Sequence, residues 1–233
     1  METKDAVITV ARPSSAGAEH NVTAGLYVHF GCHFIAPTGW LNFDASPTLR
    51  FEKIPIVGRL YTKNGARFPA HVRYGDIVKG LPVPEGSCQG VYASHVLEHL
   101  SLQDFHAAMR NTYQIMASGG VFRLVMPDLE AAARSYLREL ETGNAEANSL
   151  FLQWTRLGYE KRPRGLFEFI AAWLGNSRHL WMWDYLSVRR VLAQHGFVRI
   201  RRCGYHDCPD KRFVEVEDQR RFENSLAVEA RRP

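Results

Sequence analysis

The chain has 233 residues, 45% of them hydrophobic, which is enough apolar material for one large core and too little for two equal domains. Its formal charge is +5, but the basic residues are scattered, which favours solvated surfaces and an anionic small substrate over a nucleic-acid surface. No stretch approaches the roughly 18 apolar residues of a membrane span, and the first residues do not form a secretory signal. We therefore expect a cytoplasmic protein with no membrane partner.

The spacing of the cysteines also limits the possible classes of protein. The four cysteines, Cys32, Cys88, Cys203 and Cys208, include no pair in C-x-x-C spacing. Neither a zinc knuckle nor a disulfide framework is indicated. We expect residues 1–20 to form a flexible tail and residues 21–233 to form one domain.

Short runs rich in β-branched and aromatic residues alternate with helical patterns, which is typical of a parallel sheet with covered faces. The expected strands are LYVHF (26–30), WLNF (40–43), HVRY (71–74), GVYAS (90–94), GVFRLVM (120–126), FVRIRR (197–202) and SLAVEA (225–230). The first connection, residues 31–40, is too short for a crossover helix and contains Pro37. It should be compressed into a turn or a single helical turn.

Four helices are expected between these strands. Residues 101–116 place apolar side chains at steps of three and four, which predicts an amphipathic helix that ends at Gly119 and Gly120. Further helices are expected at 129–143, within 148–160 and at 186–196. Residues 129–186 exceed a plain crossover, so we expect them to form a helical cap over one edge of the sheet.

Polar residues follow several of the expected strands at their carboxyl ends, where open α/β sheets bind ligands. Asp44 ends the second strand, Asp76 the third, and Ser94 with His95 the fourth. A carboxylate after the second strand can accept both hydroxyls of a ribose, and one after the third can accept an adenine amine. With Gly31 in the first turn, the set suits adenosine, although an aspartate in such a place is also typical of a turn cap.

Taken in order, these blocks resemble the class I S-adenosylmethionine-dependent methyltransferases, in particular a bacterial branch of predicted methyltransferases. The blocks are GCHFIAPTGWLNFD, RYGDIVKGLPVPEGS, ASHVLEHL, ASGG, VFRLVMPDLE, HLWMWDYLSVRRVLAQHGF and VEDQRRFENSLAVEA, within residues 26–230. The resemblance implies an α/β, Rossmann-like fold: a mostly parallel seven-stranded sheet with helices on both faces, a helical cap insertion and an antiparallel last strand at about residues 225–230. It also implies S-adenosyl-L-methionine as the cofactor, and O- or N-methylation of a small or medium polar acceptor.

The resemblance also implies a role for particular residues. Gly31 and the backbone around Cys32 and His33 would face the methionine part of the cofactor. Asp44 would bind the ribose, Asp76 and Ile77 the adenine, and Ser94 and His95 would line the cofactor's other side. The chain departs from the family pattern at His33, where glycine is usual. Gly90 replaces a common aspartate and Ser118 a proline, and both changes should be nearly silent.

Methyl transfer to oxygen or nitrogen needs alignment, exclusion of water and a nearby base. The candidates for a direct role are His99, Asp128 and His179. Asp128 is also typical of a helix N-cap, and His99 of a side chain that binds backbone. The cap is rich in aromatic residues, which suit a sulfonium but more often form a core; they are Phe167, Phe169, Trp173, Trp181, Trp183 and Tyr185.

A zinc site is a competing hypothesis for one of these blocks. The residues His95, Glu98 and His99 match the H-x-x-E-H signature of zinc peptidases, which requires both histidines on one continuous helix and a third ligand. Because His95 directly follows a strand, we expect no metal site.

Three further hypotheses concern the chemistry of the chain as a whole. The first is attack within the cofactor or aminocarboxypropyl transfer, both of which release methylthioadenosine. The second is a degenerate binding module whose pocket is blocked by His33. The third is modification of nucleic acid, which rests only on the basic charge. The sequence does not indicate an oligomeric state.

Overall fold

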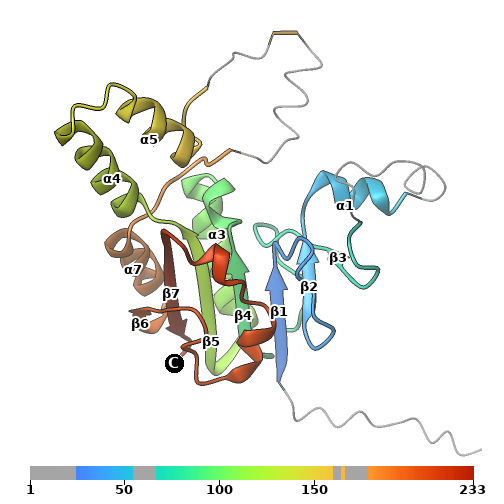
Figure 1. Cartoon of the computed structure of the whole chain (residues 1–233). Coiled ribbons are helices and arrows are strands. Elements are labelled where there is room, and N and C mark those ends of the chain that lie inside the picture. Colours follow the sequence, from blue (N-terminus) through green and yellow to red (C-terminus); the bar gives the residue numbers. More distant parts are fainter. Residues whose placement is uncertain (1–24, 55–66, 160–163, 166–177) are drawn as a thin grey trace, which may run out of the picture.

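The computed structural model describes residues 25–54, 67–159, 164–165 and 178–233. Its described part is built around one mixed sheet of seven strands (Figure 1). The strand order is β3-β2-β1-β4-β5-β7-β6, and β7 runs antiparallel to both of its neighbours. The strands are β1 Leu26–Phe30, β2 Leu41–Asp44, β3 Arg73–Tyr74, β4 Cys88–Ser94, β5 Met116–Pro127, β6 Val198–Arg202 and β7 Ser225–Arg231. This topology confirms the expected Rossmann-like fold with an antiparallel last strand. The expected tail lies outside the described residues.

All four predicted helices are present. The α-helices are α1 Pro47–Glu52, α3 Leu102–Ile115, α4 Leu129–Glu141, α5 Ala147–Thr155 and α7 Tyr185–Gln194; the 3-10 helices are η1 Leu97–His99, η2 Lys211–Glu215 and η3 Gln219–Arg221. The first connection contains no helix: residues 31–40 turn directly from β1 into β2, which pair in parallel from Val28 and Leu41 onward. The compressed connection is therefore confirmed.

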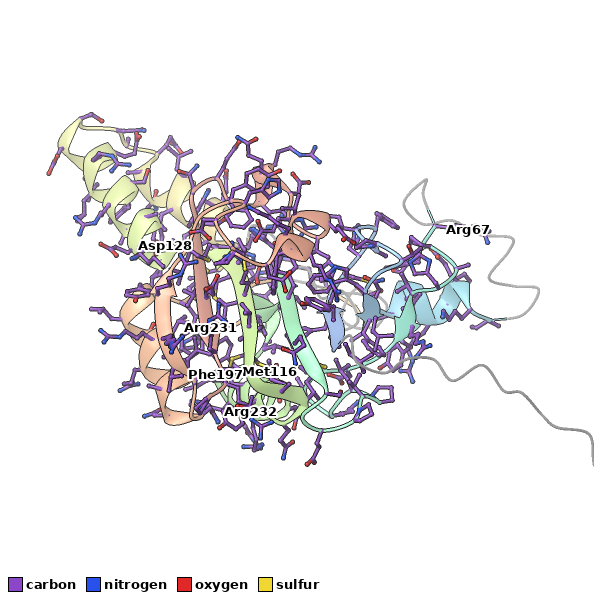
Figure 2. The ribbon with its side chains drawn as sticks, turned by 90° about the horizontal axis from the view of Figure 1, so that it is seen from below. Arg67, Met116, Asp128, Phe197, Arg231 and Arg232 are labelled. Carbon is purple, nitrogen blue, oxygen red and sulfur yellow. The ribbon has the colours of Figure 1, made fainter. Side chains whose placement is uncertain are left out.

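The predicted end of helix α3 at the two glycines was wrong. The helix stops at Ile115, and Met116 is already extended and paired with Cys88 in β4. Near the chain terminus, Arg232 donates from its guanidinium to the Met116 carbonyl and to the carbonyls of the last helical turn, so these acceptors are satisfied without a glycine cap. Figure 2 shows Arg232 and Met116 together, at the opposite end of β5 from Asp128.

The two faces of the sheet are covered differently. Alternate residues of β1, such as Val28 and Phe30, pack into a core with α3 and α7. On the opposite face, Tyr27 packs with Trp40 and with Phe213 of the segment that precedes β7. This segment crosses in front of the sheet in Figure 1, and its described helices, η2 and η3, are short. In the described part of the chain, these short helices therefore contribute the helical cover of the second face.

Helices α4 and α5 project beyond the carboxyl ends of the strands (Figure 1). They are the described part of the expected cap, whose residues 160–163 and 166–177, with Phe167, Phe169 and Trp173, lie outside the described residues. Of the other cap aromatics, Trp183 is buried against Phe105 in the core, at 4.1 Å between ring centroids. No helix in the described part of the chain is both long and apolar enough to cross a membrane.

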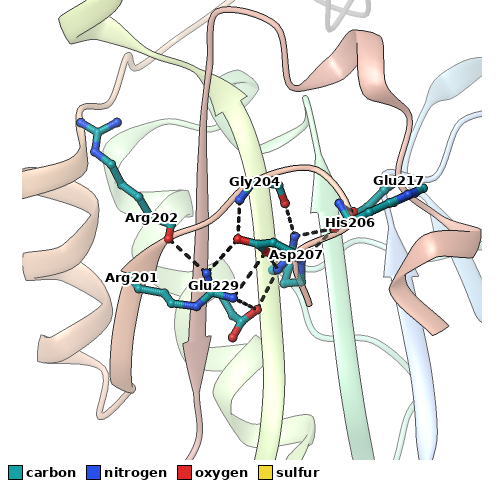
Figure 3. A network of polar contacts seen from close by, with 8 residues as sticks. Arg201, Arg202, Gly204, His206, Asp207, Glu217 and Glu229 are labelled. Atoms are coloured by element: carbon teal, nitrogen blue, oxygen red, sulfur yellow. Dashed lines mark hydrogen bonds and ion pairs between the residues drawn. The ribbon is translucent and has the colours of Figure 1, made fainter. Parts of the chain in front are cut away.

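A buried arginine, Arg123 in the middle of β5, faces the second side of the sheet. Its Nε donates to Glu217 at 2.8 Å, and its Nη1 donates to Asp207 at 2.8 Å and to Glu229 at 2.7 Å. Figure 3 shows these carboxylates together with Arg201, which also donates to Asp207 and Glu229. Burial raises the pKa of Asp207, but the hydrogen bonds from the two arginines outweigh it and hold the pKa at about 2.

Replacement of Arg123 by methionine should destabilise the protein by about 3–5 kcal/mol, because it leaves Glu217 buried without a cation and removes one of the two arginines that bind Glu229. The matched control is Arg134→Ala, which removes an exposed ion pair with Glu130 and should cost less than about 1 kcal/mol. Urea denaturation measures both. Equal losses in the two variants would contradict a structural role for Arg123.

The folded pKa of Asp207 lies below its ordinary value of 3.8. The contribution of this carboxylate to the free energy of unfolding is therefore present above pH 4 and is lost as the pH falls towards 2.

Candidate functional site

A cavity of about 1360 Å³ lies at the carboxyl ends of β1, β2 and β4. One part is lined by the turns that follow β1, β2 and β3, and the other by η1, by the end of α5 and by the segment before α7. The volume exceeds the roughly 300–1,000 Å³ of a single small-molecule site. The cavity therefore has room for a cofactor and an acceptor side by side.

Backbone geometry shapes the turn after β1. Gly31 has φ +64°, and a Cβ at this position would come within 2.6 Å of the Val96 side chain. His33 also has a positive φ, +49°. The buried Asp44 fixes this turn, since one of its carboxylate oxygens accepts from the His33 N–H at 3.0 Å and the other from the Ser46 N–H at 2.8 Å. Each oxygen keeps a further lone pair for a ligand.

The turn after β3 is fixed in a similar way. Asp76 accepts from the Val78 N–H at 3.0 Å and forms an ion pair with Lys79 at 3.3 Å. From α3, Asn111 donates to the Ile77 carbonyl at 2.7 Å, which ties the turn to the core. Asp76 and Ile77 thus line the cavity on a supported loop.

His33 occupies a backbone conformation that glycine adopts more easily than other residues. Its ring packs against Phe34, with 3.9 Å between centroids, and against Phe68. Burial lowers the pKa of His33, and the nearby Asp44 opposes this shift. The left-handed backbone explains why a glycine suits this position.

The other part of the cavity holds a buried carboxylate among histidines. Glu98 is 1% exposed, and its Oε1 lies 3.9 Å from Nε2 of His99 and 4.0 Å from Nε2 of His179. Two hydrogen bonds to backbone carbonyls set this arrangement: the Leu180 N–H donates to the Glu98 carbonyl at 2.8 Å, and His99 Nδ1 donates to the Arg178 carbonyl at 2.7 Å. Burial lowers the pKa of His179, and Glu98 partly offsets that shift.

The structure brings eight of the sequence-predicted residues to the cavity and leaves three away from it. The eight are Gly31, His33, Asp44, Asp76, Ile77, His95, His99 and His179. Cys32 is buried beneath the turn, which raises the pKa of its thiol to about 12, and Ser94 is buried within the sheet. Asp128, which is labelled in Figure 2, caps α4 by accepting from the Glu130 N–H at 2.9 Å and pairs with Arg202 at 3.2 Å. None of these three residues is among those that line the cavity.

Glu98 and Arg221 are among the cavity residues that were not predicted as site residues. Glu98 stands within the H-x-x-E-H pattern, but its burial and its lack of hydrogen-bond partners among the described residues cannot be read from spacing. Arg221 arrives from η3 and donates to the Ser94 carbonyl at 3.0 Å, while its own carbonyl accepts from His95 Nε2 at 2.9 Å. No local pattern in the sequence distinguishes Arg221 from its neighbours.

A family profile described as a methyltransferase domain matches residues 29–201. The chain belongs to this methyltransferase family. It is therefore a transferase whose cofactor is S-adenosylmethionine, and its own residues fit that cofactor: the turn at Gly31 leaves no room for a Cβ, and Asp44 keeps free lone pairs at the cavity wall.

Comparison with individual proteins gives weaker likenesses. No curated protein matches the chain. A Thermotoga maritima S-adenosylmethionine-dependent methyltransferase, described as a possible histamine N-methyltransferase, is 14% identical with a TM-score of 0.48 over 90% of this chain and 83% of that one. A chain from the complex between the Haloferax volcanii Trm112 methyltransferase activator and a putative methyltransferase is 16% identical, with a TM-score of 0.45 and coverages of 90% and 83%. The CurJ carbon methyltransferase is 11% identical, with a TM-score of 0.46, and the match covers 89% of this chain and 48% of that one.

Replacement of His33 by glycine should preserve or improve the affinity for S-adenosylhomocysteine, because glycine adopts the φ of +49° without strain. The matched variant His33→Val should bind more weakly and unfold at a lower temperature, since a β-branched residue disfavours this conformation. Calorimetric titration and thermal melting measure both. If His33→Gly abolished binding, the imidazole itself would be part of the cofactor site.

Proposed function

We propose that this methyltransferase transfers the methyl group of S-adenosylmethionine to a hydroxyl or amine of a small or medium polar acceptor. One observation carries the proposal: a single cavity contains supported acidic turns at Asp44 and Asp76 in one part, and His99 and His179 beside the buried Glu98 in the other. The first part suits the adenosine of the cofactor, and the second suits the acceptor.

In the cofactor part, the lone pairs of Asp44 not used by backbone amides are available to both ribose hydroxyls. Asp76 stands at the adenine, with Ile77 as an apolar wall. The turn at Gly31 and His33 presents backbone to the methionine part. Because these contacts are made by turns that are fixed before binding, little ordering is left to occur when the cofactor binds.

In the acceptor part, His99 provides the base. When bound, the cofactor supplies a methyl group already activated by a positive sulfur. His99 Nδ1 donates to the Arg178 carbonyl, so in the neutral ring Nε2 carries a lone pair that can accept the proton of a hydroxyl or amine. Glu98 stabilises the imidazolium that forms, and His179 lines the same part of the cavity.

The size of the cavity and the pairing of the arginines favour a small-molecule acceptor over nucleic acid. Arg201 binds Asp207 and Glu229 at 2.9 Å each, and Arg202 binds Asp128 and Glu130. These cations of the basic β6 strand are therefore already neutralised within the protein, which reduces their attraction for phosphates.

Product analysis tests the proposal. The full chain is incubated with methyl-deuterated S-adenosylmethionine, alone and with sets of small hydroxyl and amine acceptors, and the products are analysed by mass spectrometry. We expect S-adenosylhomocysteine together with a deuteromethylated acceptor. Methylthioadenosine formed from the cofactor alone would instead support cyclisation or aminocarboxypropyl transfer, and failure to bind either cofactor form would support a binding module.

Replacement of Asp44 by asparagine should weaken the binding of S-adenosylhomocysteine roughly 10- to 100-fold, because hydrogen bonds to a charged carboxylate contribute about 1.5–3 kcal/mol. The side chain keeps its shape but loses its charge and one acceptor. The matched control is Asp210→Asn, which changes an aspartate at the N-cap of η2, outside the cavity. Calorimetry should give an unchanged affinity for the control, and an unchanged affinity for Asp44→Asn would exclude the ribose role.

A further inference from the structure

The carboxylate of Glu98 has an unusual environment for a buried charge. Neither of its oxygens has a hydrogen-bond partner among the described residues, and the residue is 1% exposed. Buried carboxylates are otherwise hydrogen-bonded or paired, because burial without a partner is costly. The atoms nearest its Oε1 include His95 Nδ1 at 3.5 Å, His99 Nε2 at 3.9 Å and His179 Nε2 at 4.0 Å.

Two of these histidines present lone pairs to the carboxylate. His95 Nε2 lies 2.9 Å from the Arg221 carbonyl, and His99 Nδ1 lies 2.7 Å from the Arg178 carbonyl. A carbonyl can only accept, so each of these nitrogens carries the hydrogen. In the neutral ring the other nitrogen therefore has a lone pair on the side of Glu98. Lone pairs that face a carboxylate repel it unless a cation lies between them.

We propose that Glu98, His99 and His179 bind one divalent transition-metal ion in the acceptor part of the cavity; this inference rests on the proposed function and refines it. The three ligand atoms lie within 4.8 Å of one another. Metal–ligand bonds of about 2.0–2.2 Å require separations of roughly 3.3 Å, so small side-chain rotations close the site. The bond from His99 to the Arg178 carbonyl is the outer contact that orients a metal-binding imidazole.

The donor set indicates the kind of metal and of acceptor. Two imidazoles with one carboxylate favour zinc, iron, cobalt or nickel over magnesium or calcium, which prefer oxygen. Three protein ligands leave a coordination position open, and all three residues line the cavity. That position suits an acceptor hydroxyl, which the metal acidifies so that its proton passes to solvent. With metal bound, His99 and His179 act as ligands, and the metal rather than His99 activates the acceptor.

This site departs from the sequence-based expectation of no metal. The argument against a zinc peptidase still holds, since His95 lies in the turn before η1 and does not share a continuous helix with His99. The third ligand that the pattern lacked is His179, which lies 80 residues further along the chain than His99 and is brought back by the contacts of Arg178 and Leu180 with η1.

Metal titration of the full chain tests the inference. Protein treated with EDTA and dialysed is titrated with zinc alone by calorimetry, and with cobalt alone by visible absorption. We expect one equivalent per chain, unaffected by excess magnesium. Glu98→Gln and His179→Ala should weaken zinc binding at least about tenfold. The control His106→Ala removes one ring of the half-buried His106–His195 pair, whose nitrogens lie 3.0 Å apart, and should leave zinc binding unchanged.

The same proteins are titrated with S-adenosylhomocysteine, and thermal melting confirms that each variant is folded. We expect the wild type and all three variants to bind it with similar affinity. Absence of stoichiometric zinc binding in the wild type, or equal zinc affinity in wild type, Glu98→Gln and His179→Ala, would overturn the metal site and leave the proposed methyl transfer standing. Failure of the wild type to bind S-adenosylhomocysteine while zinc still binds would instead count against the proposed function.

Discussion

The buried guanidinium of Arg123 determines how the C-terminal part of the chain covers the sheet. It binds Asp207 and Glu217 of the segment before β7 and Glu229 within β7, so one cation joins three stretches of chain. Its Nη2 also donates to the Gly204 carbonyl at 2.8 Å. The same segment continues into η3 and the start of β7, which supply part of the cavity wall. The charge cluster on one face of the sheet thus positions residues at the edge where ligands bind.

The short first connection imposes a second constraint. Because residues 31–40 turn from β1 to β2 without a helix, the cavity lining after β1 includes Gly31 and His33, whose backbones are left-handed. The Asp44 carboxylate holds this turn through the His33 N–H. The residue that replaces the usual glycine therefore takes a left-handed backbone conformation, which its N–H bond to Asp44 supports.

Local pattern and strand-end chemistry were enough to predict much of the molecule. Short apolar runs located all seven strands. Asp44 and Asp76 were expected near each other because carboxyl ends of parallel strands meet at one sheet edge, and both line the cavity. The sequence could not show that Arg123, inside an apolar strand, binds three carboxylates that lie far from it along the chain. Nor could it show the proximity of Glu98 and His179, which depends on backbone hydrogen bonds between segments about 80 residues apart. Such long-range contacts leave no periodic signal.

The carboxylates in the two parts of the cavity differ in their hydrogen-bond donors, and this difference affects the chemistry that each part can support. The Asp44 carboxylate accepts hydrogen bonds from two backbone amides, and its remaining lone pairs can accept from neutral hydroxyls. The Glu98 carboxylate has no such donors among the described residues and depends on whatever cation lies among its histidines. If that cation is a proton on an imidazole, the ring that holds it is no longer a base. A metal ion neutralises the carboxylate and also acidifies a bound acceptor, so it satisfies the electrostatics and the reaction together.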